Sequence, residues 1–291
     1  MPDFVDFQMD TTDLFILSKL RQQSFGEIVI SMVKNKVTLK EFKELKQIKD
    51  RVEIGYPLAY VLGQIEFLER VFILNPKVLV PRPETEEWAG DLIQKLKREL
   101  TSDSKLNVIE LATGSGVIGL SVWLDLSHFI ENLLISDLSP EALDLAQENY
   151  QNLSSNFSSI SKPRFVLSDL FENFNLADLL PFKLKSNNII NLFVANLPYL
   201  PNSDNLDLPA LAHEPNMALF SGSDGLDLFR KCIEQILDLE LKFDILYFEL
   251  DPRNIFEAKD FVSKIPAFKN YKHSIINDFL GRNRVLQFDI L

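Results

Sequence analysis

The sequence predicts an α/β protein built on a mostly parallel, Rossmann-like sheet with helices on both faces. From about residue 106 onward, short apolar runs of strand length alternate with segments of helical periodicity. A glycine-containing turn, residues 112–116, follows the first run, and an acidic residue, Asp137, ends the second. Such turns and acidic strand ends hold nucleotides in sheets of this kind, so the pattern also predicts where a ligand binds.

Seven strands are expected in the sheet. Strands that are buried on both faces form continuous runs rich in β-branched and aromatic residues. Five such runs are residues 106–111, 133–137, 165–169, 189–195 and 245–250, and residues 271–277 and 284–289 are expected to close the sheet as a hairpin. Residues 117–126 are predicted to be helical, and Ser139, Pro140 and Glu141 form a typical helix start.

The chain before the sheet divides into two parts. Residues 12–54 carry apolar side chains at spacings of three and four, and Thr38 with Glu41 forms a capping-box pattern, so helices are predicted. These helices form either a plain bundle or a docking surface for a partner. Strands over residues 58–63 and 71–74 are expected to form a linking hairpin. The predicted domains are residues 1–54 (helical), 55–80 (linking β-hairpin) and 81–291 (sheet domain).

A rigid segment leads into the first helix of the sheet domain. Pro81 and Pro83 favour an extended chain there. Glu84 or Thr85 is expected to open a helix, and Trp88 begins its apolar face.

The turn after the first strand is predicted to bind an adenosine-type ligand. Gly114 and Gly116 suit a backbone with positive φ or a ligand pressed against it. Asp137 follows at roughly the 20-residue spacing at which a carboxylate accepts hydrogen bonds from ribose hydroxyls. Asp169 and Leu170, after the third strand, are expected to border the adenine. These residues leave NAD and S-adenosylmethionine both open, and a tight turn without a ligand is the structural alternative.

The tetrapeptide Asn196–Tyr199 follows the fourth strand at the edge where ligands bind in open α/β sheets. It could be an ordinary turn, since Asn and Pro are common turn residues. It also suits a planar amide or amino group. The Asn196 side-chain oxygen and the Leu197 main-chain carbonyl can accept its two N–H groups, Pro198 stiffens the turn, and Tyr199 offers a flat face. An amino-methyltransferase needs such a clamp to orient a poor nucleophile, whereas hydride transfer has no evident use for it.

Composition narrows the possible functions. The formal net charge of −12 speaks against a general nucleic-acid-binding surface. Cys232 is the only cysteine, which excludes an internal disulfide and suits a reducing cytosol, and the three histidines lack metal-ligand spacing, so no metal site is expected. No apolar run is long enough to cross a membrane, and the first residues do not form a signal peptide. We therefore expect a cytoplasmic protein.

Several motifs, in order, resemble those of the release-factor glutamine methyltransferase family (PrmC, also called HemK). The resemblance covers residues 51–288. Its motifs are Gly-Tyr-Pro-Leu-Ala-Tyr-Val-Leu-Gly at 55–63, Pro-Arg-Pro-Glu-Thr-Glu at 81–86, Glu-Pro at 214–215, Ala-Leu at 218–219, Asp-Gly-Leu-Asp at 224–227 and Gly-Arg-Asn-Arg-Val at 281–285.

The resemblance implies N5-methylation of the glutamine in the Gly-Gly-Gln motif of a peptide-chain release factor, with S-adenosyl-L-methionine as methyl donor. It implies a helical N-terminal domain that helps to dock the factor. The residues expected to contact the cofactor are Ala112, Thr113, Gly114, Ser115, Gly116, Asp137, Asp169, Leu170 and Asn196. Those expected to hold the substrate glutamine are Asn196, Leu197, Pro198 and Tyr199.

Two departures from the family pattern bear on activity. The family usually has glycine where this chain has Ala112, and proline where it has Leu197. A positive φ at Ala112 would weaken cofactor binding, while Leu197 retains the main-chain carbonyl, so activity is expected to survive.

Three other functions compete with this one. A glutamine methyltransferase of a ribosomal protein is disfavoured by Pro83. An amino-methyltransferase acting on DNA or RNA is disfavoured by the acidic charge. A binding module that has lost catalysis is suggested by Ala112 alone.

Overall fold

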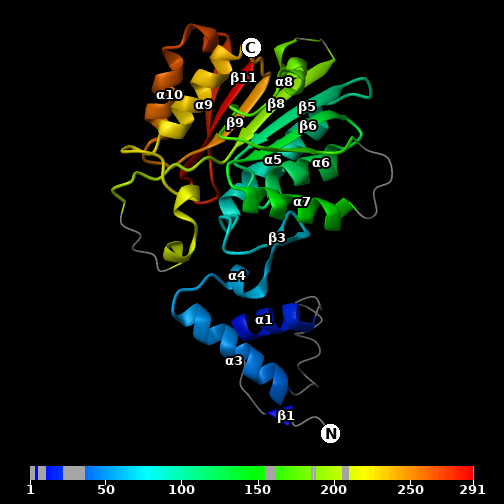
Figure 1. Cartoon of the computed structure of the whole chain (residues 1–291), viewed down its shortest axis with the longest axis vertical. Coiled ribbons are helices and arrows are strands. Elements are labelled where there is room, and N and C mark those ends of the chain that lie inside the picture. Colours follow the sequence, from blue (N-terminus) through cyan, green and yellow to red (C-terminus); the bar gives the residue numbers. More distant parts are fainter. Residues whose placement is uncertain are drawn as a thin grey trace. The chain divides into compact units, whose positions relative to one another are not determined.

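The computed structural model describes residues 4–5, 11–21, 37–154, 161–184, 186, 188–204 and 210–290 (Figure 1). The chain forms two compact units. The smaller comprises Met1–Gly63 with Leu206–His213, and the larger comprises Gln64–Asn205 with Glu214–Leu291.

The larger unit contains a seven-stranded sheet, which confirms the predicted fold class. Among the described residues its strand order is β10-β11-β9-β8-β5-β6-β7. Neighbours from β9 to β7 run parallel, whereas β11 is antiparallel to both β9 and β10. The strands are β5 (Lys105–Leu111), β6 (Ile130–Asp137), β7 (Arg164–Leu167), β8 (Ile189–Ala195), β9 (Ile245–Glu249), β10 (Tyr271–Asn277) and β11 (Asn283–Ile290).

Helices cover both faces of this sheet (Figure 1). One face carries α5 (Pro83–Glu99), α6 (Val117–Leu126) and α7 (Pro140–Ser154), and the other carries α8 (Leu176–Lys183), α9 (Asp227–Asp238) and α10 (Ile255–Ser263). Strand β8 shows why two cores result. Its Leu192 and Val194 pack in the core on the α5 side, while Phe193 and Ala195 pack in the core on the α9 side. Successive side chains of a strand point to opposite faces, so a strand buried on both sides must be apolar throughout.

The parallel strands end at one edge of the sheet. The turn at residues 112–116, Asp137, residues 168–170 and residues 196–199 follow or end β5, β6, β7 and β8 respectively. Parallel pairing therefore brings together segments that lie far apart in the sequence.

The predicted strand over residues 58–63 is wrong. Residues Leu58–Leu62 form helix α4, and the hairpin consists of β3 (Gln64–Phe67) and β4 (Arg70–Ile73). Pro57 precedes the helix, and Gly63, at a φ of 69°, ends it in the left-handed conformation. The proline and glycine thus flank a short helix, as they do at many helix ends.

Two other details differ from expectation. Helix α5 begins at Pro83, with Arg82 as its N-cap, because proline is well suited to the first helical position. Neither Glu84 nor Thr85 therefore caps it. Helix α8 was not predicted, although the Asn175 side chain caps it by accepting a hydrogen bond from the Asp178 main-chain N–H at 3.0 Å.

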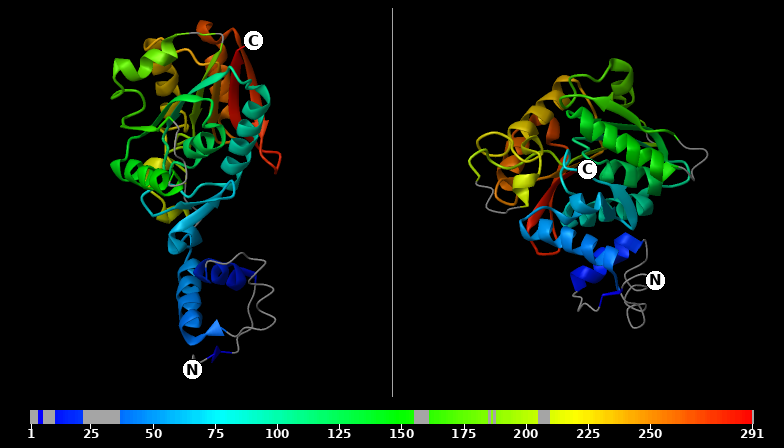
Figure 2. Two further views of the ribbon diagram at one scale, coloured as in Figure 1. Left: turned by 90° about the vertical axis from the view of Figure 1, so that its right-hand side faces the viewer. Right: turned by 60° about the horizontal axis from the view of Figure 1, so that its bottom comes forward.

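The smaller unit contains α1 (Thr11–Arg21), α3 (Leu39–Glu53) and α4, with β1 (Phe4–Val5) paired to β2 (Val37–Thr38). Helices α1 and α3 lie side by side (Figure 2). The predicted capping box is confirmed: the Glu41 N–H donates to Thr38 Oγ1 at 3.3 Å, and the Thr38 N–H donates to Glu41 Oε2 at 2.8 Å. The predicted helical positions Ile28, Val29, Met32 and Val33 lie outside the described residues.

Within the described part of the chain, every helix is too short or too polar to cross a membrane.

Candidate active site

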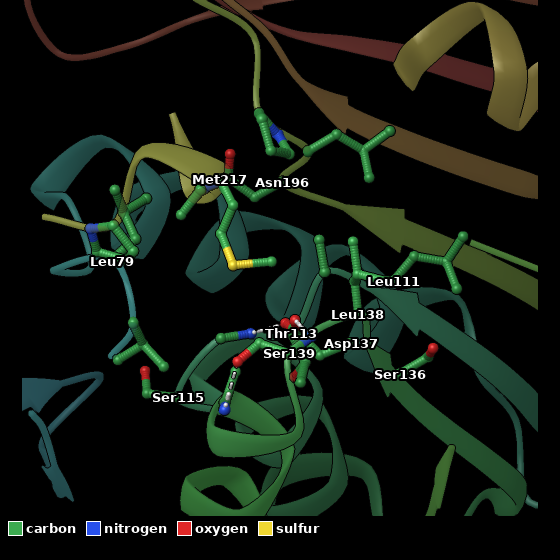
Figure 3. Close-up of a pocket in the computed structure, with 18 of the residues that line it drawn as sticks. Leu79, Leu111, Thr113, Ser115, Ser136, Asp137, Leu138, Ser139, Asn196 and Met217 are labelled. Carbon is green, nitrogen blue, oxygen red and sulfur yellow. Dashed lines mark hydrogen bonds between the residues drawn. The ribbon is translucent and has the colours of Figure 1, made fainter. Parts of the chain in front are cut away.

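A cleft of about 990 Å³, counting the space at its open mouth, lies at the carboxyl edge of the sheet in the larger unit. The turns after β5, β6, β7 and β8 line it, together with residues of the segments before α5 and after Glu214. Figure 3 shows Asn196 across this cleft from Asp137 and Ser139. The fold therefore brings together the two groups of residues that the sequence associates with cofactor and substrate.

The glycine turn has a left-handed backbone at three positions. The φ angles are 54° at Ala112, 56° at Gly114 and 84° at Gly116. A Cβ added to Gly114 would meet only Val78 Cβ, at 4.0 Å, so this glycine leaves the backbone open toward the cleft. Ala112 thus stands where the backbone conformation favours glycine. Its methyl group makes this left-handed backbone unfavourable.

Asp137 joins the turns after β5 and β6. Its Oδ2 accepts a hydrogen bond from the Gly114 N–H at 2.8 Å, and its Oδ1 accepts one from the Ser139 N–H at 2.9 Å. Burial raises the pKa of Asp137, and these two main-chain donors oppose that rise. A carboxylate has about four acceptor sites, so Asp137 can still accept from ligand hydroxyls after both contacts.

The segment after β8 is divided between the cleft and the core. Asn196, Leu197 and Pro198 line the cleft, but the Leu197 side chain is 2% exposed and packs in the core on the α9 side. Among the described residues, no main-chain or side-chain donor reaches the Leu197 carbonyl. Tyr199 does not line the cleft; its hydroxyl donates to Glu249 Oε1 at 3.3 Å.

Glu249, at the end of β9, is a functional candidate that was not predicted from the sequence. It is 1% exposed, and its Oε2 accepts hydrogen bonds from Thr85 Oγ1 and Trp88 Nε1, both at 2.7 Å. Thr85 Oγ1 also lies 3.5 Å from Asn196 Nδ2. Burial raises the pKa of Glu249, while the Trp88 and Thr85 donors lower it. Its position could have been noticed in the sequence, because Glu249 is an acidic residue at the end of an apolar strand.

No family model matches the chain. It is 32% identical over 249 residues to "Release factor glutamine methyltransferase" of Bacillus subtilis (strain 168), covering 84% of this chain and 80% of that relative. The chain belongs to the release factor glutamine methyltransferase family. The relative of that name from Bacillus cereus is 27% identical over 286 residues, which cover 94% of each chain.

A solved structure supports the fold. The hMettl16 catalytic domain in complex with MAT2A 3′UTR hairpin 1 aligns with a TM-score of 0.53 and 15% identity, covering 97% of this chain and 92% of that one. At this identity the likeness concerns the fold alone.

The Pro-Arg-Pro-Glu-Thr-Glu segment at 81–86 holds the start of α5 against four other parts of the larger unit. Arg82 Nη2 lies 2.6 Å from Glu214 Oε2, so two of the motifs that carry the family resemblance contact each other. Glu84 Oε1 lies 2.7 Å from Arg282 Nη2, and Glu86 Oε1 accepts from the Leu68 N–H at 2.8 Å. Thr85 binds Glu249. Each polar side chain of the segment from Arg82 to Glu86 therefore has a structural partner, which explains why these residue types occur together.

Glu110 is a second residue beside the cleft that was not predicted from the sequence. It lies in β5, 1% exposed, where its Oε2 accepts from Thr113 Oγ1 at 2.6 Å. Burial raises the pKa of Glu110 to about 8, although the Thr113 hydroxyl and the Gly119 N–H lower it. A Cβ on Gly119 would lie 2.3 Å from Glu110 Oε2. Residues 114–119 also read as G-x-G-x-x-G, the dinucleotide fingerprint. Its last glycine, Gly119, makes room here for the Glu110 carboxyl group.

Asp169 and Leu170 both line the cleft after β7. Leu170 has a φ of 50° and is 7% exposed, so its side chain belongs mainly to the core. Asp169 Oδ2 lies 2.7 Å from Lys231 Nζ. Lys231, from α9, was not predicted, since nothing in its sequence surroundings indicates this contact.

The cleft is suited to an adenosine-type cofactor. Asp137 provides acceptors at the end of β6, and Leu79, Leu138 and Met217 provide apolar walls. Lys77 is the one basic side chain among the described residues that line the cleft, so a pyrophosphate would find little positive charge. This set of residues fits a nucleoside without phosphates better than a dinucleotide.

Proposed function

We propose that this chain transfers a methyl group from S-adenosyl-L-methionine to the side-chain amide nitrogen of the glutamine in the Gly-Gly-Gln motif of a release factor. The observation that carries the proposal is that Asn196 and Leu197 line the same cleft as Gly114 and Asp137. Family membership supports the substrate class, since the relatives are named for it.

The residues on the two sides of the cleft have different tasks. Asp137 accepts from the ribose hydroxyls, and the open backbone at Gly114 lets the cofactor lie against the turn. Bound S-adenosylmethionine would supply a methyl group on a positively charged sulfur; the sulfur–carbon bond would break as the amide nitrogen bonds to that carbon, and the nitrogen would release one proton to water. The remaining work is orientation of the nucleophile.

Asn196 and Leu197 orient the substrate amide. The Asn196 side-chain oxygen accepts one N–H of the substrate, and the Leu197 main-chain carbonyl accepts the other. Because the Leu197 side chain is anchored in the core, its carbonyl is held on a rigid support. Replacing the usual proline by leucine keeps this acceptor.

The smaller unit is proposed to dock the release factor. Residues 1–54 of the predicted helical domain fall within this unit, which forms its own apolar core around Ile16, Leu17 and Leu45. A folded chain that lacks residues 1–54 should bind S-adenosylmethionine as the whole chain does and methylate an intact release factor more slowly. Equal rates on the intact factor would remove the docking role.

The decisive experiment incubates the protein with labelled S-adenosylmethionine and a release factor and maps the methyl group by mass spectrometry. The expected product carries one methyl on the glutamine of Gly-Gly-Gln. Asn196→Ala should lower the single-turnover rate roughly 10²–10³-fold, the scale of losing one preorganised polar contact. Asn175→Ala is the matched control, because it removes the same amide from the N-cap of α8. A methyl found only on another protein or on RNA would refute the proposal.

A further inference from the structure

We propose that Thr85 is a positioning residue that fixes the orientation of the Asn196 side-chain amide, and that Glu249 and Trp88 fix the direction of the Thr85 hydroxyl. This inference rests on the proposed function, because it assigns the Asn196 oxygen to the substrate amide. It adds to that function the reason why the oxygen, and not the nitrogen, of Asn196 faces the substrate.

Glu249 Oε2 accepts two hydrogen bonds, one from Trp88 and one from Thr85. The indole N–H of Trp88 is a donor without any acceptor capacity, and it lies 2.7 Å from this oxygen. As a carboxylate, Glu249 has lone pairs and no hydrogen of its own, so Oε2 accepts from both of its neighbours. The Thr85 hydroxyl, also 2.7 Å from Oε2, must therefore donate its single hydrogen to Glu249.

The second step follows from the hydroxyl of Thr85. A hydroxyl has one hydrogen and two lone pairs, and the hydrogen is already committed to Glu249. Toward Asn196, 3.5 Å away, Thr85 Oγ1 can offer only lone pairs. The amide of Asn196 must present its NH₂ group to Thr85, because the flipped orientation would set two acceptors against each other. Amide orientation is properly assigned from such a network.

The third step concerns the oxygen that this orientation leaves available. Within the described part of the chain, no donor reaches Asn196 Oδ1. Asn196 also lines the cleft. Its oxygen is thus an unengaged acceptor at the place where the substrate N–H is proposed to bind.

The supporting elements are rigid neighbours. Strands β8 and β9 pair with Ala195 opposite Phe248, so Asn196 and Glu249 are the next residues of two adjacent parallel strands. Thr85 is 1% exposed and lies in the first turn of α5, and Trp88 stacks on Tyr247 of β9 with ring centroids 5.9 Å apart. The hydrogen bonds that link Trp88, Glu249, Thr85 and Asn196 therefore connect one helix with two strands, and packing holds all three elements in place.

Two substitutions at Thr85 separate the hydroxyl from the shape of the side chain. Thr85→Val has the same shape without the hydroxyl, and Thr85→Ser keeps the hydroxyl. In single-turnover methylation of a release factor, Thr85→Val should lower the rate at saturating substrate about tenfold or more, with the Kd for S-adenosylmethionine changed less than twofold. Thr85→Ser should stay within about threefold of wild type. If Thr85 had only a structural role, Thr85→Val would also weaken cofactor binding and lower the melting temperature.

A second readout does not depend on activity. Nuclear magnetic resonance of the protein without ligands reports the side-chain NH₂ signals of Asn196, assigned by their absence in Asn196→Ala. Thr85→Val should shift these signals, and Thr85→Ser should restore them. If the wild-type protein methylates no release factor, the proposed function fails, and the amide signals still test the contact between Thr85 and Asn196.

Three results would overturn the inference: a wild-type rate in Thr85→Val, amide signals of Asn196 that Thr85→Val leaves unchanged, or an equal loss of rate and cofactor affinity. Circular dichroism establishes folding of each variant first. If Thr85→Val does not fold, Thr85→Ala takes its place in both measurements, since it removes the hydroxyl without placing a methyl group against Glu249.

Discussion

Replacing Ala112 by glycine tests whether the turn after β5 is strained in this chain. Ala112 has a φ of 54°, and a left-handed backbone costs an L-residue with a side chain about 1–2 kcal/mol relative to glycine. Glycine also gains freedom in the unfolded chain, which offsets about 0.4–1 kcal/mol. Ala112→Gly should therefore raise the free energy of unfolding by about 0.5–1 kcal/mol, or the melting temperature by about 1–3 °C.

The assay can be restricted to the unit that contains the turn. The two tryptophans of the chain, Trp88 and Trp123, both lie in the larger unit, so their fluorescence follows unfolding of that unit alone. Glu240→Gly is the matched control. Glu240 also has a φ of 54° and is exposed beyond the end of α9, away from the cleft. Both variants should gain stability by a similar amount.

The Kd for S-adenosylmethionine shows whether Ala112 only strains the backbone or also obstructs the ligand with its methyl group. If the strain at Ala112 is the same with and without ligand, Ala112→Gly leaves the Kd for S-adenosylmethionine within about threefold of wild type; tighter binding would show that the methyl group obstructs the ligand. A loss of stability in Ala112→Gly beside a gain in Glu240→Gly would refute the strain argument. It would mean that contacts of the Ala112 methyl group with the core outweigh its backbone cost.

Three further predictions concern the cleft. Asp137→Ala should weaken S-adenosylmethionine binding by about 1.5–3 kcal/mol, the scale of a hydrogen bond to a charged group, and unchanged affinity by calorimetry would remove Asp137 from the site. The pKa of Glu110 is raised from 4.5 to about 8, so its contribution to native-state stability is present below pH 4.5 and lost as the pH rises toward 8. Urea unfolding at pH 5 and pH 8 measures this loss. The free energy of unfolding should fall less between the two pH values for Glu110→Gln than for wild type, and an equal fall in both would contradict the raised pKa. Leu197→Pro keeps the carbonyl and should change the methylation rate less than tenfold, or about 1.4 kcal/mol. The variant should be less stable than wild type, because the leucine side chain is buried. A larger loss of rate in a folded variant would show that the leucine side chain itself takes part in the site.

The sequence was most informative where local chemistry determines the structure. The apolar runs predicted the strands because a buried parallel strand has no polar face. The capping box at Thr38 and the helix start at Ser139 were predictable because each depends on neighbours within four residues. Helix α4 was mistaken for a strand since a segment of five apolar and aromatic residues between turn signals fits either structure.

The parts that could not be predicted depend on contacts between distant residues. Thr85 and Glu249 are 164 positions apart, and nothing local to either indicates the hydrogen bond between them. The position of Tyr199 is a similar case. The contact of its flat face with substrate stays a prediction, and the partner of its hydroxyl, Glu249, comes from another strand and was not predictable.

Two carboxyl groups, those of Asp137 and Glu249, fix the positions of several donors around this site. Asp137 joins two turns by accepting two main-chain N–H groups, and Glu249 collects donors from α5 and from the segment after β8. A carboxylate accepts with both oxygens, so each donor that reaches it has only one possible direction for its hydrogen. An amide at position 249 would have to place its oxygen at Trp88 and its NH₂ group at Tyr199, which reverses the direction of the Tyr199 hydroxyl. Burying the Glu249 carboxylate costs free energy, and the same desolvation raises its pKa. In return, the Thr85 hydroxyl beside Asn196 is held in one direction.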